Sequence, residues 1–215
     1  MIGWIVSKGY LTYLNPLQNE GVRPLCIRLT FVAKFDIISG MLVGIISDTH
    51  DNLVGLQKAI QVLKGQNIEM LIHCGDWVSP FTLEYFDRQM KDLKIPIKSV
   101  VGNNPGDTKR AMMGNSKMQN PIEWAKTVML VLDIDGKKTV VYHGDDREIL
   151  STLIESQKYD IVLTGHTHAV RNEVIGKTLV INPGNTCYAC EGEITDKVSV
   201  AVYDSKTNKA EVIYF

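Results

Sequence analysis

The sequence predicts an α/β fold with mixed β-sheets, and two observations support this. From Met41 onward, short β-branched runs alternate with amphipathic segments, which is the pattern of parallel strands joined by helices. From Thr127 onward, pairs of strand-like segments follow one another around short turns, which is typical of antiparallel hairpins. Parallel strands and hairpins in one domain together predict mixed sheets.

Length and composition favour one domain with a small appendage. At 215 residues and 45% hydrophobic, the chain is long enough to bury a substantial single core. Residues 1–40 show no clean helix or strand period, contain several glycines and prolines, and carry no recognisable chemistry. We expect 1–40 to be an N-terminal extension and 41–215 to be the functional domain. Poor order of the extension, and its origin from an upstream start codon, are both open.

Charge and hydropathy exclude several classes of protein. A net charge of −1 lacks the excess of basic residues that is typical of nucleic-acid-binding proteins. The aromatic residues are spread along the sequence and form no row on which bases could stack. No apolar run approaches the roughly 20 residues that span a bilayer, and the N-terminus lacks the features of a secretory signal. We expect a cytoplasmic protein without a membrane or nucleic-acid partner.

The parallel part of the fold begins with near-continuous apolar runs, as expected for strands covered on both faces. These runs are 41–47, 69–74, 97–101 and 160–164. A helix is predicted at 51–65, where apolar residues form one stripe. Either Asp51 or Asn52 can cap its start, and Gly65 suits its end.

A second helix is predicted at 79–93, because Ser79 is a good N-cap and Pro80 suits the first helical position. The later part of the chain predicts strand pairs around Asp-Gly, Gly-Lys and Ser-Lys-Thr-Asn turns. These pairs lie within 127–144, 171–184 and 197–215.

Five polar clusters each follow a predicted strand directly. They are SDTH at 47–50, GDW at 75–77, GNN at 102–104, HGDD at 143–146 and GHTH at 165–168. The carboxyl ends of strands in α/β sheets are where ligands collect. Four of the five histidines fall in these clusters, which scattered structural histidines would rarely do.

The residue types in these clusters point to a metal site. They are oxygen and imidazole donors without thiolates, a set that suits manganese, iron, zinc or nickel. Within SDTH and GHTH two ligands stand two residues apart, so each pair can point to one side of the backbone. The glycines at 75, 102, 144 and 165 fit close backbone packing around such a centre. The candidate ligands are Asp48, His50, Asp76, Asn103, His143, His166 and His168.

The ordered series D-x-H, G-D, G-N-N, H-G and G-H-T-H resembles the calcineurin-like metallophosphoesterases, and is most similar to their small archaeal and bacterial phosphodiesterases. The resemblance covers residues 42 to about 215 and includes INPG at 181–184. It implies a four-layer α/β/β/α sandwich, with two mixed sheets face to face and helices outside. It also implies a small phosphoester as the substrate.

The resemblance implies a role for each ligand. Asp48, His50 and His168 would hold one divalent ion, Asn103, His143 and His166 would hold another, and Asp76 would bridge them. Manganese is favoured, with nickel, zinc and iron as alternatives. The implied reaction is attack on phosphorus by metal-bound hydroxide, because a bound ion lowers the pKa of water to about 7.

The group that protonates the leaving group stays unassigned. Many relatives have G-N-H-E where this chain has Asn104, and an amide cannot supply a proton. We expect Asn104 to donate hydrogen bonds to a phosphate oxygen, and we count it with His143 as catalytic. Pro105 and Gly106 precede Asp107 and put its role in doubt. These features favour phosphodiesters or aryl esters over alkyl monoesters.

Other polar residues are expected to be structural. His73 lies inside a strand and is predicted to hydrogen-bond within the fold, and the pair Cys187 and Cys190 is more simply structural than a zinc or redox site. Asp145 and Asp146 are expected to orient a ligand or to cap the following helix.

Two other functions are alternatives to the hydrolase. A retromer subunit with the same fold serves as an interaction scaffold, but it lacks part of the ligand set that is complete here. A DNA-repair nuclease would need a basic tract or a capping domain, and the sequence shows neither. The sequence leaves a homo-oligomeric state open.

Overall fold

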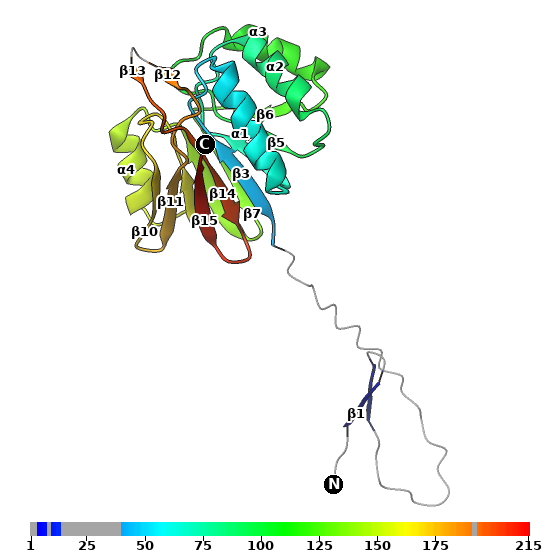
Figure 1. Ribbon diagram of the computed structural model, residues 1–215. Helices are drawn as coiled ribbons and strands as arrows, with labels where there is room; N and C mark the ends of the chain where they lie inside the picture. The colour runs from blue at the N-terminus through cyan, green and yellow to red at the C-terminus, as the bar shows by residue number, and fades with distance from the viewer. Residues whose placement is uncertain (1–3, 8–9, 14–39, 191–192) are drawn as a thin grey trace, which may run out of the picture. The chain divides into compact units, whose positions relative to one another are not determined.

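The computed structural model describes residues 4–7, 10–13, 40–190 and 193–215 (Figure 1). Its contacts divide the chain into two units, Met1–Ser39 and Gly40–Phe215. In the first unit β1 (Trp4–Ser7) pairs antiparallel with β2 (Tyr10–Tyr13). The poor order considered for the rest of the extension lies outside the described residues, and the proposed domain boundary and start codon stay predictions.

One sheet of the second unit has six strands in the order β15-β14-β3-β4-β5-β6. Strands β3 to β6 run parallel, whereas β14 and β15 add on as an antiparallel pair. The bounds are β3 (Leu42–Ile46), β4 (Met70–His73), β5 (Ile97–Ser99), β6 (Ile122–Trp124), β14 (Ser199–Asp204) and β15 (Lys209–Tyr214).

The other large sheet has five strands in the order β10-β11-β9-β8-β7, with β8, β9 and β11 parallel and both edge strands antiparallel. Both sheets are therefore mixed, as predicted. The bounds are β7 (Met129–Ile134), β8 (Lys137–Tyr142), β9 (Ile161–Leu163), β10 (Arg171–Ile175) and β11 (Thr178–Asn182); a short ribbon pairs β12 (Ala189–Cys190) with β13 (Glu193–Ile194).

The helices cover the outer faces of the two sheets (Figure 1). Apolar side chains of α1 and α2 pack on the six-stranded sheet, and those of α4 pack on the five-stranded sheet. The bounds are α1 (Leu53–Gly65), α2 (Pro80–Met90), α3 (Thr108–Gly114) and α4 (Arg147–Glu155), with a 3₁₀ turn at η1 (Asn115–Lys117). This arrangement confirms the four-layer α/β/β/α sandwich.

Alternation along the strands explains why their sequences are apolar throughout. On β9, Ile161 and Leu163 face the core between the sheets, whereas Val162 faces α4. On β3, Val43 and Ile45 face the same inner core. Burying one such side chain stabilises the fold by about 1.5–3 kcal/mol. These buried strands hold their carboxyl ends in fixed positions.

Helix caps fix where several loops end. Asn52 caps α1 by accepting from the Gly55 N–H at 2.8 Å, which decides between the two candidates. Asp51 instead accepts from Ser79 N at 2.8 Å. Ser79 caps α2, as predicted. Within the described residues, no helix has both the length and the apolar character that a bilayer-spanning helix requires.

Candidate metal centre

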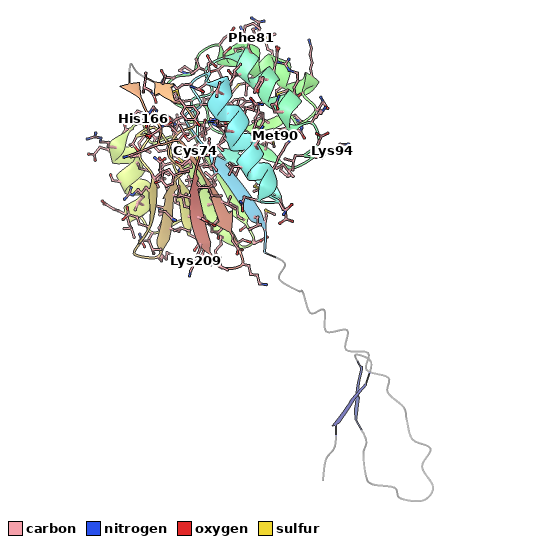
Figure 2. The ribbon with its side chains drawn as sticks, viewed as in Figure 1. Cys74, Phe81, Met90, Lys94, His166 and Lys209 are labelled. Carbon is pink, nitrogen blue, oxygen red and sulfur yellow. A yellow bond between two sulfur atoms is a disulfide. The ribbon has the colours of Figure 1, made fainter. Side chains whose placement is uncertain are left out.

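The seven candidate ligands lie in five loops that follow β3, β4, β5, β8 and β9. Figure 2 shows Cys74 in the interior of the fold, directly before the second of these loops, and His166 toward the side of α4. Backbone hydrogen bonds tie the loops together: Asp48 N donates to Gly75 O at 3.0 Å, and Gly165 N donates to His143 O at 2.8 Å. Asp76 N also donates to Val101 O at 2.9 Å, and His166 N donates to Asp48 Oδ2 at 3.0 Å, so the five loops form one connected unit.

Five of the seven ligands have left-handed backbone conformations, with φ between 43° and 66°. Aspartate and histidine tolerate this region better than most residues, but each such residue still costs about 1–3 kcal/mol. Strain of this kind persists only where the surroundings fix it, and here it sets the direction of the side chains. The residues are Asp48, His50, Asp76, His166 and His168.

The first group of ligands surrounds a buried carboxylate oxygen. Asp48 Oδ1 is fully buried and makes no hydrogen bond, while His166 N donates to Oδ2 at 3.0 Å. The Nε2 atoms of His50 and His168 lie 3.8 Å and 3.5 Å from Oδ1. A buried oxygen without a donor is costly, and a cation held by these three side chains would satisfy it.

The second group is centred on an amide oxygen. Asn103 Oδ1 lies 2.8 Å from His143 Nε2 and 2.9 Å from His166 Nδ1. His143 Nδ1 donates to the carbonyl oxygen of Cys74 at 2.8 Å. The bond to Cys74 orients the His143 ring, so that Nε2 faces Asn103 and is available to bind a metal ion.

Asp76 lies between the two groups. Its Oδ2 atom is 3.3 Å from His143 Nε2 and 3.6 Å from His50 Nε2. Two ligands that each lie about 2.0–2.2 Å from one ion are separated by roughly 3–3.6 Å, so both contacts fit shared coordination. The ligand atoms of Asp48, Asp76 and His143 also lie within 4.8 Å of one another.

The pKa shifts of the centre favour a bound positive charge. Burial alone raises the pKa of Asp48, but the neighbouring imidazoles, His168 first, outweigh it and hold the pKa far below the usual range. Burial likewise opposes the lowered pKa of Asp76, which the hydrogen bond from His143 produces. For His143, burial lowers the pKa, but the Asp76 hydrogen bond and the charges of both carboxylates outweigh burial, and the pKa is raised. The donor set therefore fits a divalent cation.

Glycines allow the backbone to approach the carboxylates. Gly102 has a φ of +91°, and a Cβ there would lie 2.2 Å from Asp76 Oδ1. A Cβ on Gly165 would lie 2.0 Å from Ser47 Oγ and 2.6 Å from Asp48 Oδ2. The predicted close packing of glycines around the centre is confirmed at both positions.

The two asparagines of the GNN loop differ in their contacts. Asn104 donates to Asp76 twice, from N to Oδ1 at 2.8 Å and from Nδ2 to Oδ2 at 2.9 Å. Its expected bond to a phosphate oxygen stays a prediction. Asp107 caps α3 by accepting from Arg110 N at 3.2 Å, which gives it a structural role.

The other polar residues also have defined places. Asp146 caps α4 by accepting from Glu148 N at 2.9 Å and from Ile149 N. Cys187 and Cys190, predicted to be structural, form a disulfide bond. Their pairing was not predicted.

Sequence reasoning missed two supporting contacts. Asn182 donates to Gly165 O at 2.7 Å and to Thr167 Oγ1 at 3.1 Å, which holds the GHTH loop; the INPG motif was the only signal for it. Thr49 Oγ1, between two ligands, lies 2.9 Å from His73 Nε2. No local pattern indicated that second contact.

His73 connects two ligand loops from inside β4. Its Nδ1 accepts from the Gly75 N–H at 3.1 Å, so the neutral ring donates from Nε2 to Thr49. Burial lowers the pKa of His73 to about 3, which keeps the ring neutral. The ring also stacks on Trp77 with centroids 3.7 Å apart. The prediction that His73 bonds within the fold is confirmed.

We expect His73→Ala to lower the free energy of unfolding by about 2–4 kcal/mol, because a cavity remains and the buried Gly75 N–H loses its acceptor. We also expect it to weaken manganese binding about tenfold or more, since the loops at Thr49 and Gly75 lose their common support. Denaturant unfolding and metal titration measure the two effects. Cys74→Ala, in the core between the sheets, is the control: it should lose stability and keep its metal affinity. Unchanged metal affinity in His73→Ala would contradict the role.

Comparison with known proteins identifies relatives of this chain. The family model of the calcineurin-like phosphoesterase superfamily domain matches residues 41–208. A phosphodiesterase of Methanocaldococcus jannaschii is 34% identical in an alignment 174 residues long, which covers 77% of this chain and 94% of that protein.

Solved structures show the same fold. The structure of an archaeal phosphodiesterase superposes with a TM-score of 0.68 at 32% identity, covering 81% of this chain and 100% of that one. Vacuolar Protein Sorting 29 from Cryptosporidium parvum gives a TM-score of 0.52 at 21% identity, covering 82% of this chain and 97% of that one. The second likeness extends to the fold alone.

Proposed function

The chain belongs to the calcineurin-like phosphoesterase superfamily, and from that premise we propose that it is a phosphodiesterase with a dinuclear metal centre. Hydrolysis of phosphoric esters with divalent metal ions follows from the family and from the relative named a phosphodiesterase. The proposal adds the number of ions, the residues that hold them and the preference for diesters.

The observation that carries the proposal is the position of Asp76. A single atom, Oδ2, faces His50 of one ligand group at 3.6 Å and His143 of the other at 3.3 Å. A carboxylate oxygen between two separate sets of donors is what a bridging ligand requires. We assign Asp48, His50 and His168 to one ion and Asn103, His143 and His166 to the other.

When bound, the ions supply Lewis-acid charge for the phosphate and lower the pKa of water so that it can act as the nucleophile. The protein's own groups fix the geometry. The Cys74 carbonyl orients His143, and His166 N holds the Asp48 carboxylate through Oδ2. Asn104 N–H groups keep Asp76 in place, and a rotation of the amide would let it donate to a substrate oxygen.

Manganese is the proposed metal, because the donors are carboxylate, amide and imidazole groups without a thiolate. Nickel, zinc and iron bind the same kinds of donor, so metal analysis of the protein decides among them. A small phosphoester is the proposed substrate. The cytoplasmic location and a homo-oligomeric state stay predictions.

The function is tested with bis-p-nitrophenyl phosphate. Purified protein with added manganese should hydrolyse it, and His143→Ala should lower kcat/KM about a hundredfold or more because one ion loses a ligand. Glu155→Gln, exposed on α4, should match the unmodified protein. Metal-replete protein that is inert toward both diesters and monoesters would contradict the proposal and favour the interaction scaffold.

A further inference from the structure

A pocket of about 200 Å³ lies beside the candidate metal centre and shares one of its residues. His143 forms part of its wall, so a substrate whose phosphate sits at the ions can extend into it. The lining consists of Val101, Gly102, Thr127, Val128, His143 and Asp145. Of these lining residues, only His143 belongs to the candidate ligand set.

The remaining walls combine apolar surface with one fixed charge. Val128 is 64% exposed and offers an apolar face that no core cluster uses. The carboxylate of Asp145 is exposed at the same pocket. Among the described residues of the lining there is no lysine or arginine. The pocket is therefore unsuited to a second anionic group.

The Asp145 carboxylate forms a hydrogen bond with the Tyr142 hydroxyl, and its two oxygens can accept further bonds beside that one. Asp146, and not Asp145, caps α4, and the Asp146 N–H donates to Tyr142 Oη at 2.9 Å. An ionised carboxylate only accepts hydrogen bonds. A partner of Asp145 in the pocket must therefore be a hydroxyl or N–H donor.

We propose that this pocket binds an uncharged ester arm that carries hydroxyl or N–H donors, as a nucleoside does, and that Asp145 selects such an arm. The proposal rests on the proposed phosphodiesterase function and names its substrate class. Asp145 accepts a hydrogen bond from the correct arm and repels an arm that ends in phosphate or carboxylate. Selectivity then comes from both an attraction and a repulsion.

The positive charge of the proposed metal centre does not by itself select one class of phosphate ester. Two divalent ions attract any phosphate, whether monoester, diester or diphosphate, and so discriminate poorly among them. A carboxylate beside the centre penalises each additional negative charge, since like charges brought together cost several kcal/mol. Monoanionic diesters pay the smallest penalty of these substrates.

Three chromogenic substrates with the same leaving group separate the effects. Thymidine 5′-(p-nitrophenyl phosphate) has a neutral arm with donors, p-nitrophenyl phenylphosphonate has a neutral arm without donors, and p-nitrophenyl phosphate has no arm and more negative charge. We expect Asp145→Ala to lower kcat/KM for the thymidine ester about tenfold, while the phenylphosphonate changes less than twofold. We expect Asp145→Asn to raise activity on the monoester about fivefold or more.

Glu148→Gln is the matched control, because it removes one negative charge from the exposed first turn of α4 without touching the pocket lining. It should leave all three rates within twofold. Equal losses on the thymidine ester and the phenylphosphonate, or no change in either Asp145 variant, would overturn the inference. Failure of the unmodified protein to hydrolyse any of the substrates would instead overturn the proposed function.

Discussion

Replacing Asp76 with Asn is expected to lower kcat/KM for bis-p-nitrophenyl phosphate by roughly a thousandfold or more. The change keeps the shape of the side chain but removes the negative charge that faces His50 at 3.6 Å and His143 at 3.3 Å. It also removes one of the two acceptors that Asn104 uses, because an amide side chain accepts hydrogen bonds through its oxygen alone. Steady-state kinetics with saturating manganese measures the loss.

Asp51→Asn is the control for the Asp76 variant. Asp51 lies in a neighbouring loop, where its Oδ1 accepts from Ser79 N and from Thr82 Oγ1, and an asparagine keeps that oxygen. We expect its activity to stay within a fewfold of the unmodified protein. An Asp76→Asn variant within fivefold of full activity would show that this carboxylate is not part of the reaction.

The second large effect concerns stability. Adding manganese to metal-free protein is expected to raise Tm by about 8–16 °C, because one site filled at a thousand times its Kd stabilises the folded state by about 4 kcal/mol and each kcal/mol shifts Tm by about 2–4 °C at this size. The buried Asp48 and Asp76 carboxylates gain a counter-charge when the ion binds. Calorimetry with and without the metal measures the shift.

The shift should depend on pH in a defined direction. The pKa of His143 is raised above its ordinary value, so its proton competes with the metal at the same nitrogen as the pH falls. We expect a smaller shift at pH 6 than at pH 8. The double variant Asp48→Ala, Asp76→Ala should lose most of the shift at either pH. An equal shift in that variant would place the stabilising metal elsewhere.

Much of the fold was predictable because buried strands have a simple requirement. A strand covered on both faces, such as β9, must be apolar at every position, and the run at 160–164 showed this directly. Elements with little buried surface gave no such signal. Neither α3 nor β6 was predicted, because α3 buries one residue, Ala111, and β6 has an exposed Glu123 between its two apolar residues.

For the site, residue types were predictable and spatial contacts were not. The five polar clusters identified the candidate ligands because ligands collect at the carboxyl ends of strands, and here strands of both sheets contribute. The bond from His143 to the Cys74 carbonyl joins residues 69 positions apart, and nothing local to either residue encodes it. The same holds for Asn104, whose two bonds to Asp76 depend on the left-handed turns of both loops.

The most direct test is electron paramagnetic resonance of manganese-loaded protein together with a metal count per chain. Two manganese ions per chain with an exchange-coupled signal are predicted, and the coupling should disappear in Asp76→Ala. A single ion per chain, or two ions without coupling in the unmodified protein, would contradict a centre in which one carboxylate joins two metals.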